Sequence, residues 1–253
     1  MTICRLCKED KILIKKSHII PDFLYKELFD RKHSLKMFNA VGFKLGSTKI
    51  SQLPTGEYEG GLLCSNCDGV VLGQFESYLA KILRNSNIPE NQKIKCCVEK
   101  NENGVQISRI TNVDYKKLKL CLLSILWRSS ISSRKMFREV NLGPYEEKLR
   151  MQLLEGNPSS DNDIEICILS WRNDKKMPTD VIGQPRRHKL AGSTFYSLLV
   201  SGYLIIYFIT NSHIHKMIRT HKLREDNTLS IIYLPEGYGI EFLLNYTNSL
   251  CKR

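Results

Sequence analysis

The sequence predicts a mixed α+β protein made of two parts, residues 1–95 and residues 96–253. The first part carries two Cys-x-x-Cys pairs and the most basic and glycine-rich stretches. The second part alternates between strand-like apolar runs and segments with helical periodicity. A chain of 253 residues with 42% hydrophobic and 25% charged residues is large and apolar enough to bury a core. We therefore expect a cysteine-rich N-terminal domain and a larger α/β region that serves as an accessory, binding or oligomerisation domain.

The first part is expected to contain short elements. Ile12–Ile14 is apolar and strand-like, and Asp22–Phe29 is expected to form a helix between the two cysteine pairs. Asp68 is expected to begin another helix, which would carry Glu76 about two turns further along.

The second part is expected to open with a β-hairpin and a long buried helix. Two strands flank Asn101–Gly104, a turn in which Asn-Gly accepts positive φ angles. Asp114 is expected to cap a helix that runs to about residue 131 and is apolar on several sides. Cys96 and Cys97, adjacent in the first strand, are interpreted as small buried apolar residues.

Strands and helices are then expected to alternate to the end of the chain. Pro144 begins a helix that ends at Gly156, Arg186–Lys189 is interpreted as a short basic loop, and Ser201-Gly202 is expected to turn between two apolar strands. The remaining expected elements are a strand over 164–170, a basic helix over 211–224 that favours an anion over a metal, a strand over 229–234 and a helix from about 240.

Charge and hydropathy narrow the classes of partner. Lysine and arginine number 38 against 26 aspartate and glutamate residues, and the net charge of +12 favours a polyanion such as nucleic acid, or an acidic membrane face. The longest apolar run, 195–209, is interrupted by serine and glycine and is shorter than the ~20 residues that span a bilayer. No secretory signal is visible, and an odd number of cysteines fits reduced thiols, so we expect a cytoplasmic protein without a membrane partner.

The two cysteine pairs, Cys4-x-x-Cys7 and Cys64-x-x-Cys67, predict a zinc site. Two residues between thiols allow both sulfur atoms of a pair to face one ion, and two pairs complete a tetrahedral shell. Four protein ligands leave no position for a substrate, so the zinc would be structural. The alternative is two unrelated pairs of buried or redox-active thiols.

His18 follows the strand-like segment and lies between the cysteine pairs in the sequence. A neutral imidazole can take a proton from water and so produce the nucleophile for attack on a phosphodiester. Asp68 and Glu76 are oxygen ligands of the kind that Mg²⁺ or Mn²⁺ prefers. The alternative is that His18 packs locally, Asp68 caps the helix and Glu76 is a solvated charge.

The order of these motifs resembles the zinc-knuckle members of the HNH, or His-Me finger, endonucleases. The resemblance covers residues 4–85 and consists of the first cysteine pair, Ser17–Pro21 and Leu62–Asp68. It implies a ββα-metal core in which His18 activates water and Asp68 binds the catalytic cation.

The chain departs from this family's pattern at the metal site. Ser17 stands where the family usually has a metal-binding aspartate, and Asp68 replaces asparagine or histidine. Upstream of Cys64, glutamate and glycine residues occupy the place of the family's asparagine. A serine hydroxyl is a poorer cation ligand than a carboxylate, and Glu76, or Glu59, is the residue expected to compensate.

Two classes of function therefore remain. The first is a metal-dependent endonuclease that cleaves DNA, with His18, Asp68 and Glu76 as its site, in restriction or phage defence as the resemblance implies. The second, favoured by Ser17, is a catalytically inactive zinc-containing nucleic-acid-binding or scaffold subunit of a larger complex with a protein partner. Cleavage that depends on His18 would separate the two.

Overall fold

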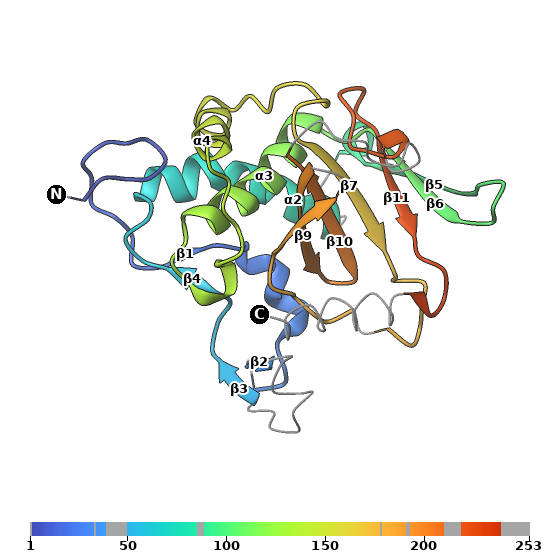
Figure 1. Cartoon of the computed structure of the whole chain (residues 1–253), viewed down its shortest axis with the longest axis horizontal. Helices are drawn as coiled ribbons and strands as arrows, with labels where there is room; N and C mark the ends of the chain where they lie inside the picture. The colour runs from blue at the N-terminus through green and yellow to red at the C-terminus, as the bar shows by residue number, and fades with distance from the viewer. Residues whose placement is uncertain are drawn as a thin grey trace.

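The computed structural model describes residues 2–32, 34–38, 50–84, 89–177, 179–190, 193–209 and 219–238. It has the predicted mixed α+β composition. Three helices, α2 (Gly73–Arg84), α3 (Tyr115–Ile131) and α4 (Tyr145–Glu155), lie beside a seven-stranded sheet (Figure 1). None of the helices in the described ranges has the length and apolar character needed to cross a membrane.

The seven-stranded sheet is formed by the second part of the chain. Its strands follow the spatial order β5-β6-β11-β7-β10-β9-β8, and every neighbouring pair is antiparallel except β11 and β7. The strands are β5 (Lys95–Lys100), β6 (Gln106–Thr111), β7 (Glu165–Ser170), β8 (Arg186–Leu190), β9 (Ser193–Val200), β10 (Tyr203–Phe208) and β11 (Leu229–Tyr233).

The first part of the chain forms two small antiparallel ladders and several short helices. One ladder pairs β1 (Ser17–His18) with β4 (Tyr58–Glu59), and the other pairs β2 (Leu35–Phe38) with β3 (Ile50–Leu53). The short helices within the described residues are η1 (Asp22–Leu28), η2 (Asn66–Leu72), η3 (Glu90–Gln92) and η4 (Lys135–Phe137).

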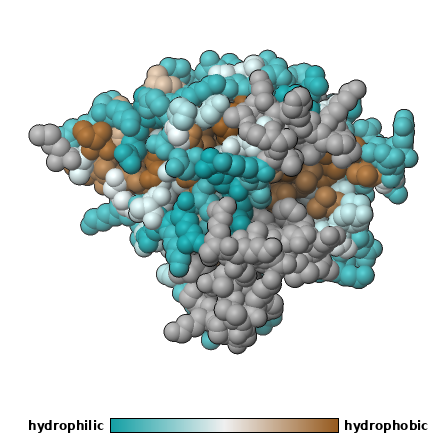
Figure 2. Space-filling view, in the orientation of Figure 1, coloured by the Kyte–Doolittle hydropathy of each residue, from teal (hydrophilic) through white to brown (hydrophobic). Residues whose placement is uncertain are grey.

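The hydrophobic core is continuous across the boundary near residue 95. Residues of the first part, such as Leu63 and Phe75, belong to the same buried cluster as Leu122 of α3 and Tyr207 of β10. The hydroxyl of Tyr207 donates to the carbonyl oxygen of Leu122 (3.2 Å), which joins α3 to the sheet. In the same view as Figure 1, hydrophobic residues form a band across the middle of the molecule (Figure 2). The two parts of the chain therefore share one core.

Local sequence signals correctly predict several of the turns and caps. The side chain of Asp114 accepts a hydrogen bond from the backbone N–H of Lys117 (3.0 Å), as expected of a helix cap. Ser201 and Gly202 both have positive φ angles in the β9–β10 turn (49° and 79°). Gly156 adopts the left-handed conformation that ends α4.

Other expectations were wrong or fall outside the described residues. Cys96 and Cys97 are exposed rather than buried, because β5 is an edge strand whose residues are all exposed. Arg186–Lys189 is part of β8 rather than a loop, since an edge strand tolerates charged side chains. The helix expected over 22–29 is a 3₁₀ helix that ends at Leu28. Most of the helix expected over 211–224, and the one from about 240, lie outside the described residues.

Lys119 of α3 is a buried cation, and the structure predicts how it affects stability. Its Nζ donates to the hydroxyl of Tyr115 (3.1 Å) and to the carbonyl oxygens of Ser160 (2.7 Å) and Asp163 (2.6 Å). Burial lowers the pKa of Lys119 from 10.5 to about 8, against the opposing effect of nearby carboxylates. Between these two values the unfolded chain binds more protons than the folded chain.

We therefore expect the contribution of Lys119 to stability to improve as the pH rises through this window, by up to about 3 kcal/mol. Urea unfolding measures the free energy of unfolding of the wild type and of Lys119→Met at about pH 8 and about pH 10. The wild type should gain stability relative to Lys119→Met at the higher pH. Lys117→Met, which removes an exposed lysine of the same helix, is the control. An equal difference at both pH values for Lys119→Met would contradict the expectation.

Candidate functional site

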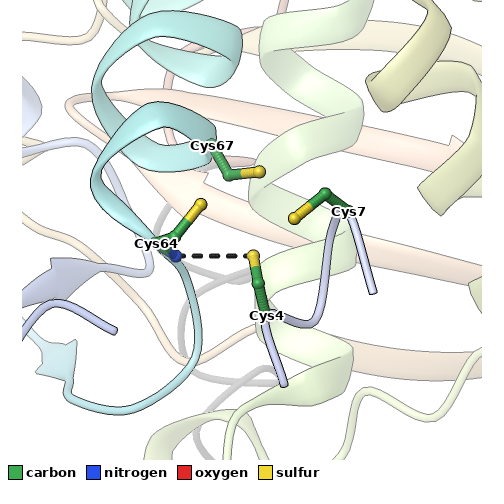
Figure 3. Close-up of side chains that lie close together, drawn as sticks. All are labelled: Cys4, Cys7, Cys64 and Cys67. Atoms are coloured by element: carbon green, nitrogen blue, oxygen red, sulfur yellow. Dashed lines mark hydrogen bonds between the residues drawn. The ribbon is translucent and has the colours of Figure 1, made fainter. Parts of the chain in front are cut away.

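The four cysteines at 4, 7, 64 and 67 come together in the structure, as their spacing predicts. Their sulfur atoms all lie within 4.8 Å of one another (Figure 3). Cys4 and Cys7 occupy a tight turn, in which the N–H of Lys8 donates to the carbonyl oxygen of Cys4 (2.9 Å). Cys64 precedes η2 and Cys67 lies within it, so that the second pair is held at the beginning of a helix.

This group could hold a metal ion such as zinc. A tetrahedral zinc–thiolate centre with bonds of ~2.3 Å places its sulfur atoms ~3.8 Å apart, so the observed spacing needs only a small contraction. Cys4, Cys64 and Cys67 are buried, and Cys7 is half-buried. Burial opposes ionisation of Cys4, but hydrogen bonds from the backbone of Cys7, Cys64 and Leu6 lower the pKa of this thiol to about 7. Burial raises the pKa of the Cys7 and Cys67 thiols, so Cys4 is the thiol of the group that ionises most readily.

Backbone hydrogen bonds join the two pairs. The N–H of Arg5 donates to the carbonyl oxygen of Leu62 (2.9 Å), and the N–H of Ile14 donates to that of Leu63 (2.9 Å). The N–H of Cys64 also donates to the sulfur of Cys4 (3.4 Å). The predicted strand over 12–14 contributes only a single bridge, between Leu13 and Cys64. These contacts explain how segments far apart in the sequence present their thiols to one point.

Asp68 lies directly beyond the second cysteine pair and contacts β1. The Ser17 hydroxyl, which is fully buried, donates to Oδ1 of Asp68 (2.6 Å). Asp68 is part of η2, a π-helical segment, and this rare form of helix is frequent at functional sites. The contact places the ladder formed by β1 and β4 against the beginning of the helix that continues as α2.

His18 has a different set of neighbours. Its Nε2 lies 3.1 Å from the hydroxyl oxygen of Thr55 and 3.5 Å from Oδ1 of Asp22. Its ring lies edge-on to that of Tyr58, with the centroids 6.1 Å apart. Successive side chains of a strand point to opposite faces, so His18 leaves the ladder on the face away from Ser17. The side chain of His18 is partly accessible, with 26% of its surface exposed.

Glu76 is held by a buried arginine of α3. Arg128 donates through one terminal nitrogen to Oε1 of Glu76 (2.5 Å) and through the other to the carbonyl oxygen of His18 (2.6 Å). It donates further to the carbonyl and hydroxyl oxygens of Ser124 (3.4 and 3.3 Å). Only 2% of the Arg128 side chain is exposed. Arg128 therefore connects the backbone of the candidate base to the helix that carries the candidate cation ligands.

Glu59, the other carboxylate considered as a cation ligand, binds the end of α3. Its oxygens accept hydrogen bonds from the hydroxyls of Ser132 (2.6 Å) and Ser133 (2.7 Å) and from the N–H of Ser133 (2.9 Å). Burial raises the pKa of Glu59, but these hydrogen bonds outweigh that effect and lower it below its usual value. Glu59 is thus an ionised carboxylate with an anchoring role in this structure.

The structure brings some of the predicted site residues together and leaves others apart. It joins Asp68 to the residue before His18, but the hydrogen bonds of the described residues do not link the imidazole to Asp68 or Glu76. The sequence reasoning did not predict Asp22 or Arg128 as neighbours of His18. Asp22 lies only four residues after His18, and this short spacing could have predicted the contact. Arg128 lies 110 residues after His18, so no local pattern indicates that contact.

The fold and the site together define a mixed α+β protein with a four-cysteine centre at the beginning of a helix. Comparison with protein-family models, curated proteins and solved structures finds no match for this chain.

Proposed function

We propose that the chain is an HNH-type, divalent-metal-dependent endonuclease with a structural zinc, and that it cleaves DNA in restriction or phage defence. The hydrogen bond between Ser17 and Asp68 is the observation that carries the proposal. It brings a strand, its antiparallel partner and the helix after the second cysteine pair into one unit, the order expected of a ββα-metal core. His18 directly follows Ser17 in β1, and its side chain leaves the ladder on the opposite, partly accessible face.

The surroundings of His18 suit a general base. With its proton on Nε2, the imidazole donates to Thr55 and faces the carboxylate of Asp22, which fixes the orientation of the ring. Nδ1, which has no hydrogen-bond partner among the described residues, is then left to accept a proton from water. Mg²⁺ or Mn²⁺ would be held by Asp68, and by Glu76 if it exchanges partners with Arg128, and would stabilise charge on the leaving oxygen.

Loss of His18 is expected to slow cleavage strongly. We expect wild-type protein with Mg²⁺ or Mn²⁺ to nick supercoiled DNA and His18→Ala to be slower by about 10²–10⁴-fold, the usual contribution of a general base. His221→Ala, which removes a histidine outside the site, is the matched control and should cleave at the wild-type rate. Equal cleavage by the wild type and His18→Ala would remove the proposed mechanism.

A second candidate function is a catalytically inactive, zinc-containing nucleic-acid-binding or scaffold subunit. The observation that favours it is that both predicted cation ligands already have protein partners: Asp68 accepts from Ser17, and Glu76 is paired with Arg128. Binding of Mn²⁺ to the zinc-loaded protein separates the two candidates. The endonuclease should bind a further ion that is lost in Asp68→Ala, whereas salt-sensitive DNA binding without Mn²⁺ binding or cleavage supports the subunit.

A further inference from the structure

Two cations surround the aromatic ring next to His18. The Nζ of Lys16 lies 5.2 Å from the ring centroid of Tyr58, and the guanidinium carbon of Arg134 lies 5.6 Å from the same centroid. Lys16 comes directly before β1, whereas Arg134 comes from the loop after α3. Two segments far apart in the sequence therefore deliver positive charge to one aromatic side chain.

Both cations are available to an external anion. Neither Lys16 nor Arg134 forms an ion pair with a carboxylate among the described residues, and both are exposed. The Nε of Arg134 donates to the carbonyl oxygen of Tyr58 (2.9 Å), which orients the guanidinium and leaves its terminal N–H groups for a ligand. The carboxylate of Glu59 reduces the local positive charge, but its oxygens accept hydrogen bonds from Ser132 and Ser133.

The ring and its cations share the face of the ladder that carries the imidazole. Tyr58 is the register partner of His18 in the β1–β4 pair, so both side chains leave the same face. An oriented guanidinium can bind two oxygens of a phosphate at once, and a lysine adds a mobile point charge. A phosphate held by these groups would lie beside His18.

We infer that Lys16, Tyr58 and Arg134 form the contact for the phosphodiester backbone of a nucleic acid next to His18. The inference deepens the proposed function, on which it rests for the class of ligand. The contact would be independent of base sequence, because its donors address phosphate oxygens. It does not require that the chain cleave its ligand.

Binding assays with matched double variants test the inference. Lys16→Ala/Arg134→Ala removes the two cations at the site. Lys95→Ala/Lys100→Ala removes two exposed lysines from the β5–β6 hairpin, which lies at the opposite end of the molecule from β1 and β4 (Figure 1). The two variants have the same net charge. Binding to a fluorescent DNA duplex is followed by anisotropy over a range of salt concentrations, without added Mg²⁺ or Mn²⁺ so that no cleavage occurs.

We expect the site variant to bind at least about tenfold more weakly than the hairpin variant, and its slope of log affinity against log salt to fall by about two units. Duplex RNA and single-stranded DNA of equal length identify which nucleic acid is preferred. Equal affinities and slopes for the two variants, with thermal unfolding like that of the wild type, would overturn the inference. Loss of binding in the site variant, when wild-type protein shows no cleavage, would uphold this contact and refute the endonuclease.

Discussion

Removal of a metal ion from the four-cysteine group is expected to unfold the N-terminal part of the chain. The four thiols come from two segments that are far apart in the sequence, and the second of these segments includes the beginning of η2. Binding of a structural zinc contributes on the order of 10 kcal/mol to folding in small domains, because the unfolded chain does not present its ligands together. The core is shared between the two parts, so the loss should also lower the thermal stability of α3 and the sheet.

Metal analysis of purified protein should find about one zinc per chain. A zinc chelator, or Cys64→Ser, should lower the midpoint of thermal unfolding and remove the helix signal of the first part. Cys97→Ser is the matched control, because Cys97 is exposed and lies outside the cluster. Protein that contains no metal and unfolds at the same temperature with and without the chelator would refute the zinc centre.

Replacement of Arg128 by methionine is expected to destabilise the protein by about 3–5 kcal/mol, the usual result of removing one partner of a buried ion pair. The carboxylate of Glu76, whose side chain is only 23% exposed, would lose its cation, and the carbonyl oxygen of His18 would lose its donor. Arg224→Met is the matched control, because Arg224 pairs with Asp226 at the surface and should cost at most about 1 kcal/mol.

Urea unfolding of these variants measures the effect. The double variant Arg128→Met/Glu76→Met should lose less unfolding free energy than the two single variants lose in sum, because it leaves no uncompensated charge. If Arg128→Met unfolds like Arg224→Met, Arg128 is not the connection between α3 and the segment of His18 that the structure indicates.

Features that depend on neighbouring residues were predictable from the sequence. The hairpin turn before Gly104, the Asp114 cap and the left-handed end of α4 at Gly156 each follow from local backbone preferences. The expectation for Cys96 and Cys97 failed because burial depends on a strand's position in the sheet, and β5 lies at the edge. The division near residue 95 follows a change in composition and hydrophobic pattern along the sequence. The core is set by packing, and it extends across this division.

The sequence by itself determined the four thiols and their grouping, because the spacing within each Cys-x-x-Cys pair already directs two sulfur atoms toward one ion. Only the tertiary structure decided what surrounds His18: the contact of Ser17 with Asp68, the connection through Arg128 and the cations around Tyr58. These contacts join residues 51 to 110 positions apart or lie on different elements, and such pairs are chosen by the packing of the whole core rather than by any local pattern.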